Sequence, residues 1–204
     1  LIVLPVAKAL SGTWQQLSLA AEPYNRSEKR IEVVDTCLNS AAQGLLVLEI
    51  AKAAESGENL DKLVRRVEEL KNRVRIFVSV RTFKFMVKGG RVSPLKGLAA
   101  KLLNLKPIVS LDESGRGIAF DKAFSYRGLI RKISFLIDEI NRNPGIVDYA
   151  VVHADDINRA REFAALAESL IGKPPAYITE ISPVIGMHSG KGAVAIGLIE
   201  KLPE

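Results

Sequence analysis

The first 80 residues alternate between short apolar runs and longer stretches with helical periodicity. Residues 1–7, 31–35 and 74–80 are apolar and contain many β-branched side chains, so each predicts a buried strand. Strands that alternate with helices are typical of parallel β-α-β units in a doubly wound sheet. The helical stretches between and after these strands are 13–24, 39–56 and 59–73.

Residues 81–204 mix strands and helices in a less regular order. Residues 112–115 form a polar turn between two apolar runs, which indicates a β-hairpin. Ser93 and Pro94 are typical of an N-cap and first helical residue, so a helix is expected to reach about Asn104. The other expected elements are strands at 106–111, 117–123, 147–153, 176–181 and 193–199 and helices at 125–141 and 155–171.

A glycine-rich turn at 88–94 follows the third predicted strand of the first half. We therefore place a domain boundary after residue 80. The sequence predicts an α/β protein whose first domain, residues 1–80, has a doubly wound parallel sheet. The second domain, residues 81–204, would be a mixed α/β unit.

Composition places these elements in a globular protein with a sizeable core. Hydrophobic residues make up 48% and charged residues 25% of the 204 residues, a balance typical of folded domains. No apolar run approaches the roughly 18 residues that a membrane-spanning helix needs, so we expect no integral membrane segment. Residues 1–4 lack a basic flank and are followed by Pro5, which favours a strand over a signal peptide.

Cysteine, histidine and charge narrow the possible functions. With one cysteine, Cys37, and two histidines, neither an internal disulfide nor a zinc-binding set of these residues can form. We expect no metal, no cofactor and a cytoplasmic location. The net charge of +6 fits either a solvated basic surface or an anionic partner. Scattered basic residues and only 6% aromatics argue against nucleic acid as that partner.

Polar segments at strand ends are candidates for anion binding. Ser11, Gly12 and Thr13 follow the first strand and open a helix, whose N-terminal N–H groups could bind an anion together with the two hydroxyls. The same three residues could equally be an ordinary helix cap. Ser40, downstream of the second strand, lies at a comparable place.

Two glycine-rich segments add basic side chains. In KGGRVS at 88–93, Arg91 could bind a carboxylate or phosphate, or could lie solvated in a tight interdomain turn. In GMHSGKG at 186–192, His188 and Lys191 could contact a ligand, or the loop could be a flexible connection.

These segments together resemble the DegV family. They occur in the family's order and at similar spacing over nearly the whole chain, so the set is far more specific than any one segment. The matching segments are LSGTW at 10–14, VVDT at 33–36 with Ser40 and Gly44 downstream, KGGRVS at 88–93, LKPI at 105–108 and HSGKGA at 188–193.

The resemblance implies a two-domain fold with a long-chain fatty acid, such as palmitate, stearate or oleate, buried between the domains. Family members act as the lipid-binding subunit of fatty-acid kinase. They present the acyl carboxylate to a separate ATP-binding kinase subunit, so this chain would not itself be an enzyme. The residues implied are Ser11, Gly12, Thr13, Ser40, His188 and Gly190 for the ligand, and Arg91 and Lys191 for a phosphate or the kinase partner.

The chain also departs from the family pattern. An N-terminal portion of about 75–80 residues, with a threonine that contacts the carboxylate, has no counterpart here, so the first sheet is expected to be incomplete. Lys191 replaces a proline of the family's H-x-G-P-G-A segment. Phe124 stands where members often carry an arginine, and Arg127 is nearby.

Two other function classes remain open from the sequence. Ser11 and His188 could act as nucleophile and base of a small serine hydrolase, although Ser11 is not in a G-x-S-x-G elbow. The chain could also be a purely structural interaction module of a larger protein.

Overall fold

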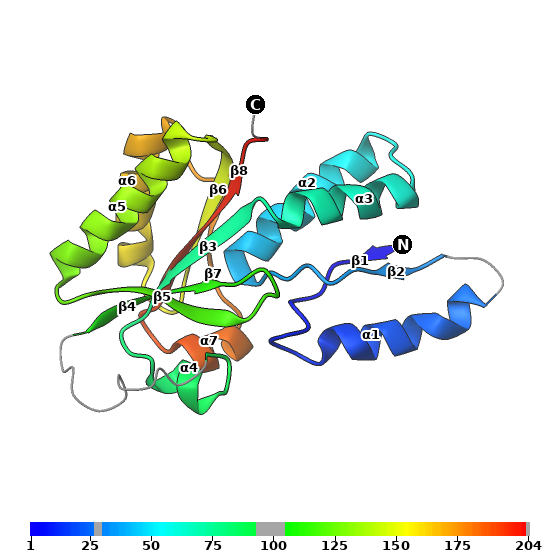
Figure 1. Cartoon of the computed structure of the whole chain (residues 1–204), viewed down its shortest axis with the longest axis horizontal. Coiled ribbons are helices and arrows are strands. Elements are labelled where there is room, and N and C mark those ends of the chain that lie inside the picture. The colour runs from blue at the N-terminus through cyan, green and yellow to red at the C-terminus, as the bar shows by residue number, and fades with distance from the viewer. Residues whose placement is uncertain (27–29, 93–104, 203–204) are drawn as a thin grey trace.

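A computed structural model describes residues 1–26, 30–92 and 105–202 (Figure 1). Helices pack on a six-stranded sheet, and a two-stranded sheet with its own helix lies beside them. The expected α/β class is confirmed. The helices are α1 (Thr13–Ala21), α2 (Ser40–Glu55), α3 (Leu60–Lys71), α4 (Lys84–Lys88), α5 (Tyr126–Arg142), α6 (Ile157–Ile171) and α7 (Pro183–Ser189), with a 3-10 helix, η1, at Glu22–Asn25.

The six-stranded sheet has the strand order β5-β4-β3-β8-β6-β7. Strands β6 and β7 run parallel, and the other neighbours in this sheet run antiparallel. The separate small sheet is the parallel pair β1-β2. The strands are β1 (Ile2–Val3), β2 (Glu32–Val33), β3 (Val74–Ser79), β4 (Lys106–Leu111), β5 (Gly117–Ala123), β6 (Ile146–His153), β7 (Ile178–Glu180) and β8 (Val194–Glu200).

Strand β3 corrects one part of the sequence prediction. Residues 74–80 were expected to extend the parallel sheet of the first domain, whereas β3 pairs antiparallel with β4 and β8. That expectation is wrong because an apolar run predicts a strand but not its neighbours, and here one neighbour comes from the end of the chain. We therefore call residues 1–39, which hold β1, α1, η1 and β2, the N-terminal lobe, and residues 40–202 the sheet lobe.

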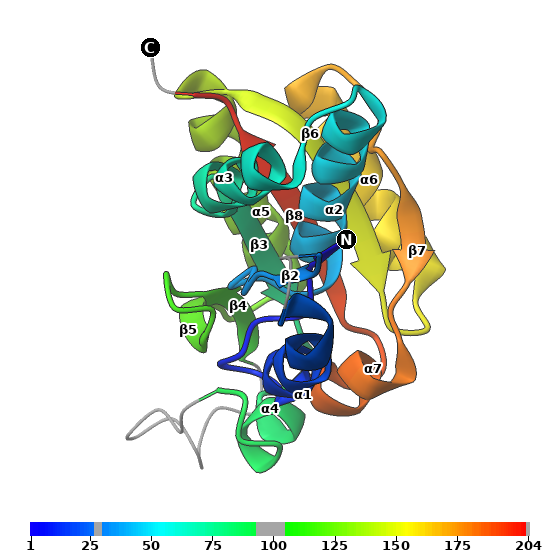
Figure 2. The ribbon, with the colours of Figure 1, turned by 90° about the vertical axis from the view of Figure 1, so that its right-hand side faces the viewer.

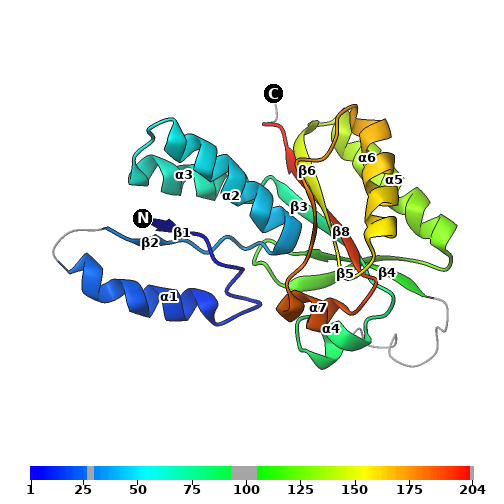
Figure 3. The same ribbon diagram turned by 180° about the vertical axis from the view of Figure 1, so that it is seen from behind.

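Alternating residues of the central strands fill two cores. On β6, Tyr149 and Val151 pack with α5 and α6, whereas Ala150 and Val152 pack with α2 and α3. Figures 2 and 3 show these helix pairs on opposite faces of the sheet. A strand buried on both faces needs apolar side chains at successive positions, which explains the continuous apolar run at 193–199.

Gly197 brings α2 against the centre of the sheet. A Cβ at this position of β8 would lie 2.7 Å from the backbone N of Ala42 and 2.8 Å from the carbonyl carbon of Ala41. Only glycine permits this approach. The first turn of α2, and the loop that leads into it, are therefore held against the sheet.

The segment at 186–192, expected as a glycine-rich loop, is partly helical. Helix α7 continues to Ser189, and the turn is confined to the residues after it. Ser182 caps this helix by accepting a hydrogen bond from Ile185 N at 3.4 Å, and Pro183 follows at the first helical position. The helix expected from Ser93 to about Asn104 lies outside the described residues.

Candidate functional site

A cavity of about 510 Å³ lies between the N-terminal lobe and the sheet lobe. One wall comes from β1, the loop after it and α1. The other comes from β3 and β4, and α4 and α7 close one side. The apolar residues that line it include Val3, Leu4, Val6, Leu10, Leu17, Ile76, Val78, Met86, Val109, Leu111, Val184 and Ile185.

Polar side chains from three segments far apart in the sequence line the same cavity: Ser11, Thr13, Arg91 and His188. The Ser11 hydroxyl lies 2.8 Å from the Thr13 hydroxyl and accepts a hydrogen bond from Thr13 N at 3.2 Å. Ser11 thus stands just before α1, whose N-cap is Gly12. Hydroxyls and free N–H groups at a helix start can bind an anion.

Arg91 joins the two lobes beside these hydroxyls. Its Nε donates to the carbonyl of Leu10 at 3.2 Å, and its Nη1 donates to the carbonyl of Gly89 at 2.6 Å. The guanidinium therefore holds the residue before Ser11 against the turn that follows α4. Among the lining residues of the described chain there is no Asp or Glu, so the fixed charge of Arg91 favours a negatively charged ligand group.

The surroundings of Gly89 explain why the KGGR segment has a glycine at this position. A Cβ at this position would overlap with Nδ1 of His188 and would lie 2.9 Å from its Cε1. The imidazole therefore lies directly on the Gly89 backbone. The glycine-rich segments at 88–93 and 186–192 therefore meet at the contact between Gly89 and His188.

The remaining predicted site residues do not line this cavity. Gly12 is exposed at the start of α1, and Gly190 ends α7 against the ring of Phe85, whose Cδ2 a Cβ would approach to 2.6 Å. Lys191 forms an exposed ion pair with Asp155 at 2.5 Å. This pair raises the pKa of Lys191 and lowers the pKa of Asp155. Ser40 lines a smaller hollow next to the cavity.

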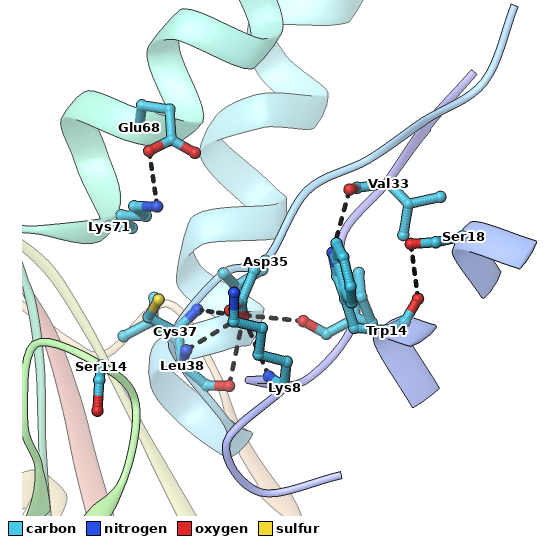
Figure 4. A network of polar contacts seen from close by, with 12 residues as sticks. Lys8, Trp14, Ser18, Val33, Asp35, Cys37, Leu38, Glu68, Lys71 and Ser114 are labelled. Carbon is cyan, nitrogen blue, oxygen red and sulfur yellow. Dashed lines mark hydrogen bonds and ion pairs between the residues drawn. The ribbon is translucent and has the colours of Figure 1, made fainter. Parts of the chain in front are cut away.

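Asp35 has a structural role in the N-terminal lobe (Figure 4). Its Oδ1 accepts from the backbone N of Lys8 and of Cys37, each at 3.1 Å. The Lys8 ammonium lies 3.9 Å from Oδ2 and 5.4 Å from the ring centroid of Trp14, whose Nε1 donates to the carbonyl of Val33. Burial and the nearby Asp35 raise the pKa of the Cys37 thiol. This network fixes the loop that carries Ser11.

The geometry gives the hydrolase hypothesis no support. The Ser11 hydroxyl bonds Thr13, and in the described part of the chain it has no hydrogen bond to His188. A serine nucleophile needs a base within hydrogen-bond reach. Within the same residues, no three His, Cys, Asp or Glu side chains group in a way that could hold a metal ion. No described helix is both long and apolar enough to cross a membrane.

The structure adds two site residues that sequence reasoning did not select, Asn39 and Ser189. Both line the cavity and the smaller hollow beside it. In the sequence, Asn39 precedes a helix and is indistinguishable from an ordinary N-cap, and Ser189 is a small residue in a glycine-rich segment. Neither pattern signals a cavity.

Comparisons with known proteins give the family of the whole chain. The family model for uncharacterised proteins of the DegV family matches residues 1–201. A DegV domain-containing protein of Clostridium acetobutylicum is 31% identical over 201 residues, which cover 98% of this chain and 70% of that protein.

Two solved structures extend the comparison to the fold. A fatty acid binding DegV family protein of Streptococcus agalactiae has a TM-score of 0.84 and 26% identity, with 98% of this chain and 70% of that chain covered. DegV of Bacillus subtilis, described as a fatty acid binding protein, has a TM-score of 0.82 and 25% identity, with 98% and 71% covered. With the family match over residues 1–201, these findings show that the chain belongs to the DegV family.

Proposed function

We propose that this chain is a carrier that binds a long-chain fatty acid, such as palmitate, stearate or oleate, in the cavity between its lobes. The observation that carries the proposal is the division of one cavity of about 510 Å³ into apolar walls and a polar group that contains Arg91. The named function of the Streptococcus agalactiae and Bacillus subtilis proteins supports it.

The two parts of the cavity match the two parts of a fatty acid. Each methylene transferred from water to an apolar wall contributes about 0.8 kcal/mol, so the tail supplies most of the affinity. The carboxylate must keep hydrogen-bond partners when it leaves water. Ser11, Thr13, His188 and Arg91 can supply them, and the start of α1 adds a favourable partial charge.

Exposure of the polar end supports a role in presenting the acid to another protein. Thr13 and Arg91 are exposed, so a carboxylate beside them would lie near the surface. A separate cytoplasmic kinase subunit could then bring ATP to it. A carboxylate oxygen would attack the γ-phosphorus and ADP would leave, while this chain supplied binding and orientation.

Lipid binding by the full chain tests the proposal. Native mass spectrometry after incubation with palmitate should show a one-to-one complex. Ser11→Ala should weaken binding about tenfold or more, because a charged carboxylate loses a hydrogen bond. Ser18→Ala is the matched control, since the Ser18 hydroxyl bonds the carbonyl of Trp14 on α1 and does not line the cavity. A chain that retains no added fatty acid would contradict the proposal.

The kinase role has its own test. The loaded chain, mixed with the ATP-binding subunit of a fatty-acid kinase and ATP, should release ADP in proportion to the bound acid. Release that does not depend on the acid would leave lipid binding intact but remove the proposed role of this chain in phosphorylation.

A further inference from the structure

A side pocket of about 40 Å³ adjoins the main cavity. The two hollows share six lining residues, which are Asn39, Ile76, Val78, Met86, Ile185 and Ser189. A hollow needs a volume of roughly 10–15 Å³ to hold one water molecule. The side pocket therefore has room for a small substituent of a ligand that occupies the main cavity.

Asn39 lines this pocket, and its side chain does not make the hydrogen bond that is usual for its position in the helix. It is the N-cap residue of α2, where an asparagine oxygen normally accepts from the N–H groups of the first turn, but it makes no such bond. Its Oδ1 is enclosed and has no hydrogen-bond partner among the described residues. Two residues near Asn39, Cys37 two positions before it and Ser40 directly after it, have φ angles of 55° and 52°. Such positive angles are uncommon for residues other than glycine.

Ser189 lines the same pocket from the end of α7. It is 5% exposed, and its Oγ also has no partner within the described chain. A helical serine can donate to the carbonyl four residues earlier, here that of Ile185, but no such bond is present. Because buried polar groups are nearly always hydrogen-bonded, two such atoms beside one small pocket point to a partner that arrives with a ligand.

The chemistry of the two atoms defines that partner. The Asn39 oxygen can only accept, whereas the Ser189 hydroxyl can donate and accept. A ligand hydroxyl could donate to Asn39 and accept from Ser189, while a carbonyl or carboxylate would offer no proton to Asn39. No Asp, Glu, Lys or Arg is among the pocket's lining residues in the described chain. His153 also lines the pocket, and its Nδ1 already accepts a hydrogen bond from Asp156 N at 3.3 Å. The lining therefore favours an uncharged group.

We infer that the preferred ligand is a long-chain hydroxy fatty acid whose hydroxyl enters the side pocket and bonds Asn39 and Ser189. This inference rests on the proposed function, because it assigns the acyl chain to the main cavity. It adds a second polar recognition point, separate from the carboxylate end at Ser11 and Arg91.

Competition binding tests the inference. The full chain is titrated with stearic acid and with a panel of monohydroxystearic acids that carry the hydroxyl near the carboxylate, in the middle or near the methyl end. At least one hydroxy acid should bind more tightly than stearic acid by a factor of roughly three to ten or more, because its hydroxyl exchanges water for hydrogen bonds to Asn39 and Ser189. Equal affinity across the panel and stearic acid would overturn the inference and leave the proposed function standing. Failure of every acid to bind would overturn both.

Variants identify the pocket. Asn39→Ala and Ser189→Ala, made singly and together, should lower the ratio of hydroxy-acid affinity to stearic acid affinity, measured in the same variant, to about one. Ser169→Ala is the control, because the Ser169 hydroxyl bonds the carbonyl of Leu166 on α6, outside both hollows. A preference that survives in the two single variants would also overturn the assignment.

Discussion

The two lobes that enclose the cavity differ in the interactions that stabilise each of them internally. In the sheet lobe, apolar side chains fill both faces of a six-stranded sheet. In the N-terminal lobe, the strands are two residues long. Few apolar side chains are buried in its described part: Pro5, Ala7, Ala21, Val34 and Leu38. The cavity thus has one wall fixed by core packing. The other wall depends on polar contacts together with a few apolar residues, Val34 and Leu38 among them, that join the core of the sheet lobe.

Side-chain hydrogen bonds of Asn25 and Thr36 compensate for the small apolar core of the N-terminal lobe. The Asn25 oxygen accepts from the backbone N of Arg30 and of Ile31, each at 3.0 Å, and its amide donates to the carbonyl of Ile31 at 2.7 Å. The buried Thr36 hydroxyl donates to the carbonyl of Pro5 at 2.8 Å. Such bonds fix loops without a large core, so this lobe is expected to open locally before the sheet lobe unfolds.

The largest effect is expected in the sheet core. Phe163→Ala should lower the free energy of unfolding by about 3–5 kcal/mol, because the side chain is fully buried on α6 and its removal leaves a cavity. Urea denaturation measures the change. Phe135→Ala, on the exposed face of α5, is the matched control and should change stability by less than about 0.5 kcal/mol. Similar losses in both variants would contradict the two-sided core.

A smaller and local effect is expected from Asp35→Ala. The variant leaves the backbone N–H groups of Lys8 and Cys37 without their acceptor, which should destabilise the N-terminal lobe by about 1–3 kcal/mol. Cys37 is the single cysteine, so its alkylation rate reports on this lobe. The rate should rise, because the loss of the Asp35 carboxylate also lowers the pKa of the thiol.

Asp148→Ala is the control for that measurement. Asp148 pairs with Lys173 at 3.0 Å in the sheet lobe, so its loss should leave the alkylation rate of Cys37 unchanged. Equal acceleration in both variants would mean that the lobes open together.

Alkaline pH should act on the sheet lobe through Tyr149. Burial raises the pKa of this phenol to about 12 from an ordinary value of 10.0. Its contribution to stability is therefore complete below pH 10 and is lost as the pH rises towards 12, since the unfolded chain ionises first. The difference in unfolding free energy between the wild type and Tyr149→Phe should shrink over this range. A constant difference in urea denaturation would exclude the phenol as the cause.

The smallest effect is expected at Lys191. Its ammonium pairs with the exposed Asp155, and exposed ion pairs contribute little. Lys191→Ala should leave both stability and fatty-acid affinity within experimental error, as should Lys122→Ala, an exposed lysine on β5 that lines neither hollow. A tenfold loss of affinity in Lys191→Ala alone would restore the ligand contact that the sequence suggested.

The contrast between the lobes also explains what the sequence could predict. Helices α2, α3, α5 and α6 and strands β4, β5, β6 and β8 lie close to the predicted ranges, because long periodic patterns reflect burial in a core. Residues 1–7 were expected to be one strand, but β1 covers only Ile2–Val3. Pro5 cannot donate to a neighbouring strand, and the following residues serve the loop that Asp35 holds.

The candidate site was less accessible to sequence reasoning. Local spacing left Ser11, Arg91 and His188 each as either a ligand contact or a structural residue, and only the family resemblance joined them. The cavity brings all three together. Asn39 and Ser189 could not be found in this way, because the absence of their hydrogen-bond partners is a property of the folded chain.

The contact between Gly89 and His188 means that the residue tolerated at one of these positions depends on the residue at the other. A side chain at 89 would occupy the space of the imidazole, so substitutions at 89 and 188 are expected to be non-additive. A larger residue at 89 would be tolerated best with a smaller one at 188. Libraries that vary one position alone would therefore miss most of the compatible pairs.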